Sequence, residues 1–400
     1  MYSVSTCWNS QRHTDGRAML REIRALGFDA AELSHGTRIS LVPGILDAVD
    51  AGEIRISSLH NFCPLPMGVE RAAPNLYQFS DERPRERELA LKHTLKTLEF
   101  AARVRAPVVV LHSGSIEMKQ YTDKLLDLAA RGEKETGKYR KLCAELDEKR
   151  EVKKVKFFER TLETLKQILP EARARGVKLG IENRQALEEL PLESDYDFLF
   201  RELSSPNLVY WHDTGHAQIK ENLGFIHHAL HLESQSDRLA GFHIHDVQFP
   251  GRDHCAPGAG TIDFAALQHL AELAGVILQF HAPEVQDHRR RLHARGKFKR
   301  LERVLDGQLA IARTLVGEFV NVRRRMGDAH RQRAEIVQAG NFDFARVHRL
   351  EDARHEAHAD AVAQLRVFKA EVADLAQHGA PVRVTVGIPA GGKRIHGVKA

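Results

Sequence analysis

The sequence has few cysteines, and no two of them are closely spaced. Only four occur among 400 residues, and no CxxC pattern is present. This excludes a disulfide framework and a zinc site built from thiolates, and it favours free thiols in a reducing compartment. No apolar run is long enough to span a bilayer, and the N-terminal MYSVSTCWNS has neither a basic flank nor an apolar core. We therefore expect a cytoplasmic protein.

A large excess of charge of one sign is also missing. The net charge is +5, with 42% hydrophobic and 28% charged residues, which is ordinary for a globular protein. Much of the positive charge lies in arginine-rich segments towards the C-terminus, so the whole fold does not have the character of a nucleic-acid binder. Histidine, by contrast, is abundant, with 23 residues, although the count alone defines no site.

Short apolar runs alternate with helical patterns up to about residue 284. The helices are indicated by apolar residues spaced three and four apart, as in AMLREIRALG and FFERTLETLKQILPEARARG. Eight β-α units in succession predict an α/β TIM barrel. A doubly wound sheet is the alternative, but STCWNSQRHTDG after the first strand is not the glycine-rich loop typical of that fold. The predicted strands are YSVSTCW, FDAAELSHG, IRISSLHNF, PVVVLHSGS, VKLGIENR, LVYWHDTGH, LAGFHIHDV and GVILQFHAP.

Two regions exceed a plain barrel, which we assign to residues 1–284. After the fourth strand, residues 115–156 are rich in Lys and Glu and predict an inserted helical hairpin, either a charged surface pair or a lid or dimer contact. Residues 285–378 predict a C-terminal helical hairpin extension with an apolar stripe, which would pack on the barrel or form a homodimer. Residues 379–400 predict a loose tail.

The predicted strands end in residues that ionise or bind metals. The C-terminal strand ends of a TIM barrel form its active site. One buried histidine is usually a satisfied core residue, but six successive strands with such residues need a cation or one another. Imidazole with carboxylate ligands suits Mn²⁺, Zn²⁺, Co²⁺ or Fe²⁺, and Mg²⁺ less. From the third strand to the eighth, the residues are His60; His112; Glu182 and Asn183; Asp213 and His216; His243, His245 and Asp246; and Gln279 and His281.

The motifs IEN, HDTGHA, HIHD and DHCAPGAGTIDF resemble those of the xylose isomerase-like TIM barrel superfamily. This superfamily includes sugar isomerases and epimerases, inosose dehydratases and apurinic endonucleases. The resemblance extends over roughly residues 1–283. Each motif is short, and the specificity comes from their order and spacing on successive strands.

The resemblance implies a metal site with ligands from the fifth to the eighth strand. Carried over residue by residue, the ligands are Glu182, Asp213 and His243, with Gln279 at the fourth position. The family has a glutamate at that position. A glutamine amide can ligate a metal, but it brings no charge and does not act as a general base. Of the family's two opposed glutamates only Glu182 then remains, with Glu284 as a distant substitute.

The other predicted site residues contact substrate or transfer protons. Glu182 and His216 are the predicted catalytic residues, and the proton-transfer partner of Glu182 would be a histidine, namely His112, His216 or His254. The predicted substrate-binding residues are His60, His112, Asn183, His216, His245, Arg252 and His254.

The leading expectation is an isomerase or epimerase of a small sugar or keto-polyol, in which one Mn²⁺, Zn²⁺, Co²⁺ or Mg²⁺ ion acidifies a C–H beside a carbonyl. A lyase of the inosose dehydratase or keto-glycoside type comes second, and Gln279 favours it. A phosphodiesterase resembling the apurinic endonucleases comes third. Against it stand Gln279 and the sequence Arg252-Asp253-His254, where those enzymes have Asp-x-His. The fourth is a non-catalytic scaffold. The leading expectation involves neither nucleic acid nor membrane.

Overall fold

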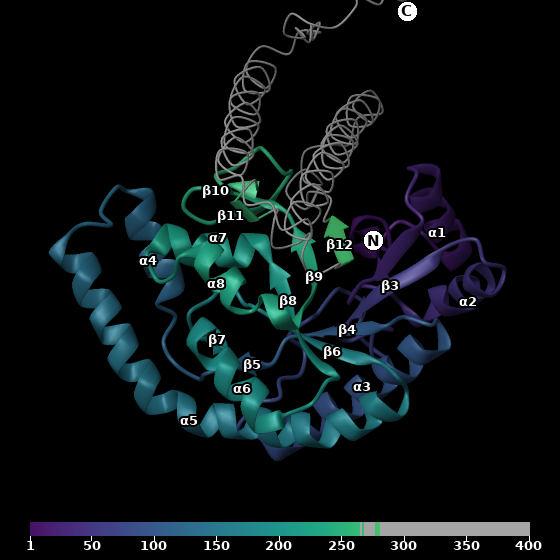
Figure 1. The fold of residues 1–400 in the computed structure, drawn as a ribbon, viewed down its shortest axis with the longest axis horizontal. Helices are drawn as coiled ribbons and strands as arrows, with labels where there is room; N and C mark the ends of the chain where they lie inside the picture. The colour runs from purple at the N-terminus through teal and green to yellow at the C-terminus, as the bar shows by residue number, and fades with distance from the viewer. Residues whose placement is uncertain (265, 268–276, 281–400) are drawn as a thin grey trace, which may run out of the picture. The chain divides into compact units, whose positions relative to one another are not determined.

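A computed structural model of the chain describes residues 1–264, 266, 267 and 277–280 (Figure 1). The predicted C-terminal hairpin at 285–378 and the predicted tail at 379–400 lie outside the described residues. The same holds for His281 and Glu284.

Eight parallel strands close into a barrel in the order β1-β12-β9-β8-β6-β4-β3-β2. Each predicted apolar run contributes one of these strands, so the expected TIM barrel is confirmed. The closing strand β12 pairs with β1 on one side and with β9 on the other, with Gln279 opposite Ser3 and His243. The barrel strands are β1 (Tyr2–Ser5), β2 (Ala30–Leu33), β3 (Arg55–His60), β4 (Val108–Leu111), β6 (Lys178–Glu182), β8 (Leu208–Asp213), β9 (Leu239–Ile244) and β12 (Ile277–Phe280).

Helices surround the barrel (Figure 1). In α1, Asp15 caps the first turn by accepting the N–H of Ala18 at 2.9 Å, while Met19 and Ile23, four residues apart, are buried on the face towards the barrel. The helices are α1 (Gly16–Ala25), α2 (Val42–Asp50), α3 (Pro84–Arg103), α4 (Thr122–Ala130), α5 (Gly137–Ala174), α6 (Tyr196–Leu203), α7 (Thr214–Leu223) and α8 (His228–Ser234), with short 3₁₀ turns at Thr6–Trp8, Ile39–Leu41, Glu193–Asp195 and Ser236–Arg238.

The segment after β4 contains α4 and a single long helix, α5, of 38 residues. The sequence suggested a hairpin up to about residue 156, followed by a separate helix. Instead α5 runs through that position, because no glycine follows Gly137 and the only proline is Pro170 near the end. Leu146 in its first half and Phe157 in its second are both buried. Among the described residues, no helix combines the length and apolarity needed to cross a membrane.

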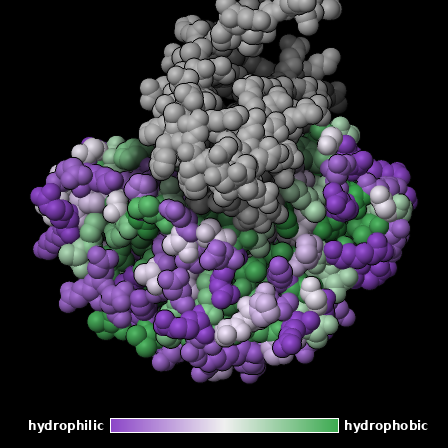
Figure 2. Space-filling view, viewed as in Figure 1, coloured by the Kyte–Doolittle hydropathy of each residue, from purple (hydrophilic) through white to green (hydrophobic). Residues whose placement is uncertain are grey.

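Two small antiparallel pairs extend the C-terminal ends of the barrel strands: β5 (Gly114–Ser115) with β7 (Glu189–Leu190), and β10 (Asp246–Gln248) with β11 (Arg252–Cys255). The β10–β11 pair packs against α7 (Figure 1). Asp246 fixes the loop that follows, since its carboxylate accepts the N–H groups of Gly258, Gly260 and Ile262 at 2.8–3.1 Å. The outer face seen in Figure 2 is largely hydrophilic, with apolar residues scattered across it.

Candidate metal centre

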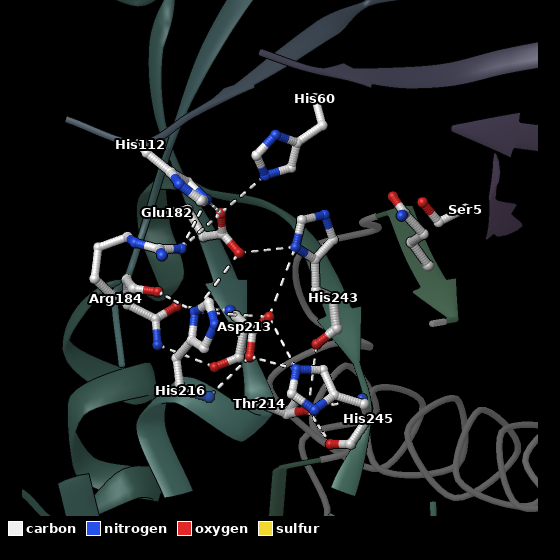
Figure 3. A network of polar contacts seen from close by, with 12 residues as sticks. Ser5, His60, His112, Glu182, Arg184, Asp213, Thr214, His216, His243 and His245 are labelled. Carbon is white, nitrogen blue, oxygen red and sulfur yellow. Dashed lines mark hydrogen bonds and ion pairs between the residues drawn. The ribbon is translucent and has the colours of Figure 1, made fainter. Parts of the chain in front are cut away.

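Glu182 ends β6 and lies among buried basic side chains (Figure 3). Its Oε2 lies 2.9 Å from His112 Nε2 and 3.3 Å from His60 Nε2, and its Oε1 lies 2.8 Å from His243 Nδ1. The Arg184 guanidinium approaches to 3.5 Å. Burial acts to raise the pKa of Glu182, but the contacts with His243 and His112 together outweigh it and hold the pKa well below the usual range. Glu182 is therefore ionised.

Two of these histidines, His112 and His60, place Nε2 beside the Glu182 carboxylate. His112 Nδ1 donates to Asn75 Oδ1 at 2.6 Å, and its Nε2 accepts from Arg184 at 2.7 Å. Burial and the charge of Arg184 hold the pKa of His112 well below its ordinary value, so the ring is neutral. His60 Nδ1 donates to the carbonyl of Asn61 at 3.0 Å, which turns its Nε2 towards Glu182 Oε2. Arg184 is thus a cation that His112 and Glu182 share in this structure.

Asp213 ends β8 and organises the other half of the cluster. Its Oδ1 accepts the backbone N–H of His216 at 2.8 Å, which caps α7. His245 Nδ1 accepts the backbone N–H of His254 at 3.0 Å, so its proton is on Nε2, which donates to Asp213 at 2.9 Å. The Oδ2 atom lies 3.7 Å from His243 Nδ1. His245 therefore orients the carboxylate through its N–H.

His216 and Asn183 meet at the same strand ends. His216 Nδ1 donates to the Asn183 carbonyl at 2.8 Å, and burial lowers the pKa of the His216 ring, leaving Nε2 as a lone-pair donor. The Asn183 side chain binds the backbone of Asp213 at both ends, accepting its N–H at 2.6 Å and donating to its carbonyl at 3.0 Å. Asn183 thus aligns β6 with β8, and its predicted contact with substrate stays a prediction.

Three overlapping groups of side chains could each hold a metal ion. Within each group the ligand atoms lie within 4.8 Å of one another. Imidazole and carboxylate donors at this density suit Zn²⁺, Mn²⁺, Co²⁺ or Fe²⁺. The group of Glu182, Asp213 and His243 contains three of the four predicted ligands. The groups are His60, His112 and Glu182; Glu182, Asp213 and His243; and Asp213, His216 and His245.

Gln279, the fourth predicted ligand, is buried and hydrogen-bonded to other side chains. Its Nε2 donates to Glu32 at 2.6 Å, and its Oε1 lies 3.3 Å from Ser58 Oγ, whose hydroxyl proton is donated to Glu32. In this geometry the amide donates a hydrogen bond to the carboxylate of Glu32. Metal ligation by Gln279 stays a prediction.

The loop residues predicted to bind substrate differ in position. Arg252 on β11 is exposed, and its guanidinium lies 3.4 Å from Gln248 Oε1. His254 stacks on His245 with ring centroids 4.2 Å apart and an interplanar angle of 7°. His254 is thus joined to the cluster through His245.

Two buried residues of this cluster were missed by the sequence analysis. Glu32 on β2 is fully buried and accepts from His243 Nε2 at 3.3 Å. Arg184 follows the IEN motif and links Glu182 to Glu189, 3.0 Å away. The signal for Glu32 was a single carboxylate inside an apolar strand, the same signal that singled out Asp213.

A second histidine cluster lies outside the barrel, between β8, α7 and α8. His212 faces away from the barrel because it alternates with Asp213 along β8. Its Nε2 lies 2.8 Å from His228 Nε2, while the Tyr210 hydroxyl bridges His212 and His231 at 2.8 and 2.9 Å. Burial lowers the pKa of His228 to about 3 and that of His231 to about 4. This cluster therefore folds in the neutral form.

We expect this second cluster to make the fold acid-sensitive. The folded-state pKa values of His228 and His231 lie below the unfolded value of about 6.5, so their contribution is complete above pH 6.5 and is lost as pH falls towards 4 and then 3. Each histidine should lower the unfolding free energy by about 1.4 kcal/mol per pH unit in that window. Urea unfolding at pH 7, 6 and 5 measures it. His228→Gln and His231→Gln should flatten the dependence, and the exposed His227→Gln should not. Equal slopes in all four proteins would contradict this assignment.

Comparison with known proteins identifies the barrel. The sequence matches the family model described as xylose isomerase-like TIM barrel over residues 20–278. No curated protein sequence matches the chain. Similar solved structures include three for which the parentheses give the TM-score, the sequence identity, and the shares of this chain and of the other chain that are covered. They are a D-tagatose 3-epimerase-like protein (0.52, 19%, 79% and 99%), an L-ribulose 3-epimerase (0.55, 14%, 82% and 96%) and the 3-keto-D-glucoside 4-epimerase YcjR from E. coli (0.53, 16%, 78% and 98%).

Proposed function

Because this chain belongs to the xylose isomerase-like TIM barrel family, as the match over residues 20–278 shows, we propose that it is a divalent-metal-dependent isomerase or epimerase of a small sugar or keto-polyol. The observation that carries the proposal is the buried group of Glu182, Asp213 and His243 at the C-terminal end of neighbouring barrel strands. The epimerase names of the similar solved structures agree with it.

Glu182, Asp213 and His243 would hold the ion. A bound divalent cation polarises a substrate carbonyl and acidifies the neighbouring C–H. Glu182, ionised at rest, would accept the proton. His216, whose neutral ring keeps an acceptor nitrogen, would orient a hydroxyl of the sugar. The lack of a second carboxylate at position 279 suits proton transfer between Glu182 and a histidine.

A second candidate is a phosphodiesterase with more than one metal ion. The observation that favours it is the overlap of the three ligand groups, which share Glu182 and Asp213 and place His60 and His112 beside the predicted single-metal site. Two metal ions several ångströms apart can stabilise both the attacking and the leaving oxygen of a phosphoryl transfer.

We expect the full chain, offered Mn²⁺, Zn²⁺ and Co²⁺ and then desalted, to retain about one ion per chain by elemental mass spectrometry. Asp213→Asn should retain far less. The loaded protein, incubated in D₂O with a panel of ketoses and keto-polyols, should incorporate deuterium beside the carbonyl and form the epimer. Two or three ions with cleavage of abasic DNA would support the phosphodiesterase. Full metal retention by Asp213→Asn would show that the ligand set is wrong.

A further inference from the structure

Glu32 of β2 is a carboxylate held in one orientation inside the barrel. It is fully buried and accepts four hydrogen bonds. Ser58 Oγ donates at 2.8 Å, Ser5 Oγ at 3.1 Å, Gln279 Nε2 at 2.6 Å and His243 Nε2 at 3.3 Å. A buried carboxylate with this many donors is a fixed negative charge.

The contact between Glu32 and Gln279 crosses an intervening strand. Strand β1 lies between β2 and β12 in the barrel, with Ser5 opposite Glu32 and Ser3 opposite Gln279. Residues two apart on a strand face the same side, so Ser3 and Ser5 share the interior face. Their small side chains leave the room that lets Gln279 reach Glu32 over β1.

The contact with Glu32 decides which nitrogen of His243 faces the cluster. His243 Nε2–H is donated to Glu32, so Nδ1 points at Glu182 Oε1, 2.8 Å away, and towards Asp213 Oδ2 at 3.7 Å. A histidine that binds a metal usually donates its other ring N–H to a carboxylate, which fixes the tautomer and strengthens the ligand. Glu32 is the carboxylate that accepts the Nε2–H of His243 in this way.

We propose that Glu32 is the positioning carboxylate of the metal centre, and that it supplies from β2 the negative charge that Gln279 on β12 lacks. The inference rests on the proposed metal-dependent function. Gln279 completes the arrangement because its amide N–H is donated to Glu32. A glutamate at position 279 would face Glu32 with acceptors only.

The first test measures Co²⁺ and Zn²⁺ affinity of the full chain by calorimetry, together with the visible absorption of the Co²⁺ form. Glu32→Gln should weaken binding about 10- to 100-fold and shift the Co²⁺ spectrum, because His243 loses its carboxylate partner. Adding Gln279→Glu to that variant returns one carboxylate and one amide to the pair. The double variant should recover most of the affinity, to within about fivefold of the parent.

Two further variants separate positioning from folding. Ser58→Ala keeps the charge of Glu32 but removes one of its donors, and should cost about two- to fivefold in affinity. Glu188→Gln changes a buried glutamate that binds Tyr121 and Thr122 elsewhere, and should leave metal affinity and the Co²⁺ spectrum unchanged. Circular dichroism melting of each metal-free variant shows whether the fold is retained.

The outcomes distinguish this inference from the proposed function. If the parent binds the ion and Glu32→Gln binds it equally well, the role of Glu32 is overturned while the proposed function stands. If the parent binds no ion, the proposed function fails and the role of Glu32 falls with it. Weak metal binding by both Glu32→Gln and the double variant would show that a carboxylate on β12 cannot replace the carboxylate of Glu32 on β2. That result would overturn the proposed role of the negative charge.

Discussion

Glu182→Gln should lower kcat/KM for proton exchange beside the substrate carbonyl by about 10³-fold or more, since a positioned general base alone contributes about 10²- to 10⁴-fold. Metal affinity should fall by more than about 100-fold, because the variant removes the charge of a proposed ligand and not merely the hydrogen-bond partner of one. The substitution keeps the shape of a side chain that contacts His60, His112 and His243 within 3.3 Å. Deuterium incorporation and metal titration measure the two effects separately.

Glu188→Gln is the matched control for that experiment. Glu188 is as buried as Glu182, but its carboxylate accepts from the backbone and hydroxyl of Thr122 and from the N–H of Tyr121. We expect this variant to lose stability while keeping metal affinity and kcat/KM. If Glu182→Gln retains parental exchange with bound metal, Glu182 is not the base.

The second large effect is expected for Gly215→Ala in the HDTGHA motif. A Cβ at position 215 would lie 2.0 Å from His245 Cε1 and 2.5 Å from its Nδ1. The His245 ring is also stacked on His254, so it has little room to retreat. Moving it breaks its hydrogen bond to Asp213. Overpacking of this kind lowers the free energy of unfolding by about 1–3 kcal/mol. Metal affinity should fall at least about tenfold, because Asp213 loses the N–H that His245 donates to its carboxylate. Urea unfolding of the metal-free protein and metal titration measure both.

Gly137→Ala provides the control for a new methyl group in the first turn of a helix. Gly137 begins α5, and nothing lies within 4 Å of the position its Cβ would take. We expect a gain of about 0.5–1 kcal/mol, since alanine restricts the unfolded chain more than glycine does. A Gly215→Ala protein as stable and as metal-competent as this control would show that His245 does not need its observed position.

The periodicity of the sequence was sufficient to predict the barrel. Each of the eight apolar runs became a barrel strand, because buried parallel strands are read as continuous apolar segments and the number of β-α units then decides the fold. The same logic placed Glu182, Asp213 and His243 together, since the carboxyl ends of parallel strands meet at one end of the barrel. The sequence did not predict that α5 is continuous. A charged helical segment is followed there by an amphipathic helical segment, and nothing in the local pattern shows whether the two are one helix or two.

What the tertiary structure alone decided is how the polar groups are paired. Gln279 and Glu32 are 247 residues apart in sequence, and they meet only because barrel closure sets β1, with its two small serines, between their strands. The hydrogen-bond partners of His112, His243 and His245 likewise lie on other strands and loops. Local sequence therefore determined which residues reach the C-terminal end of the barrel. The partner of each donor and acceptor there depends on contacts across the closed barrel, which no local pattern encodes.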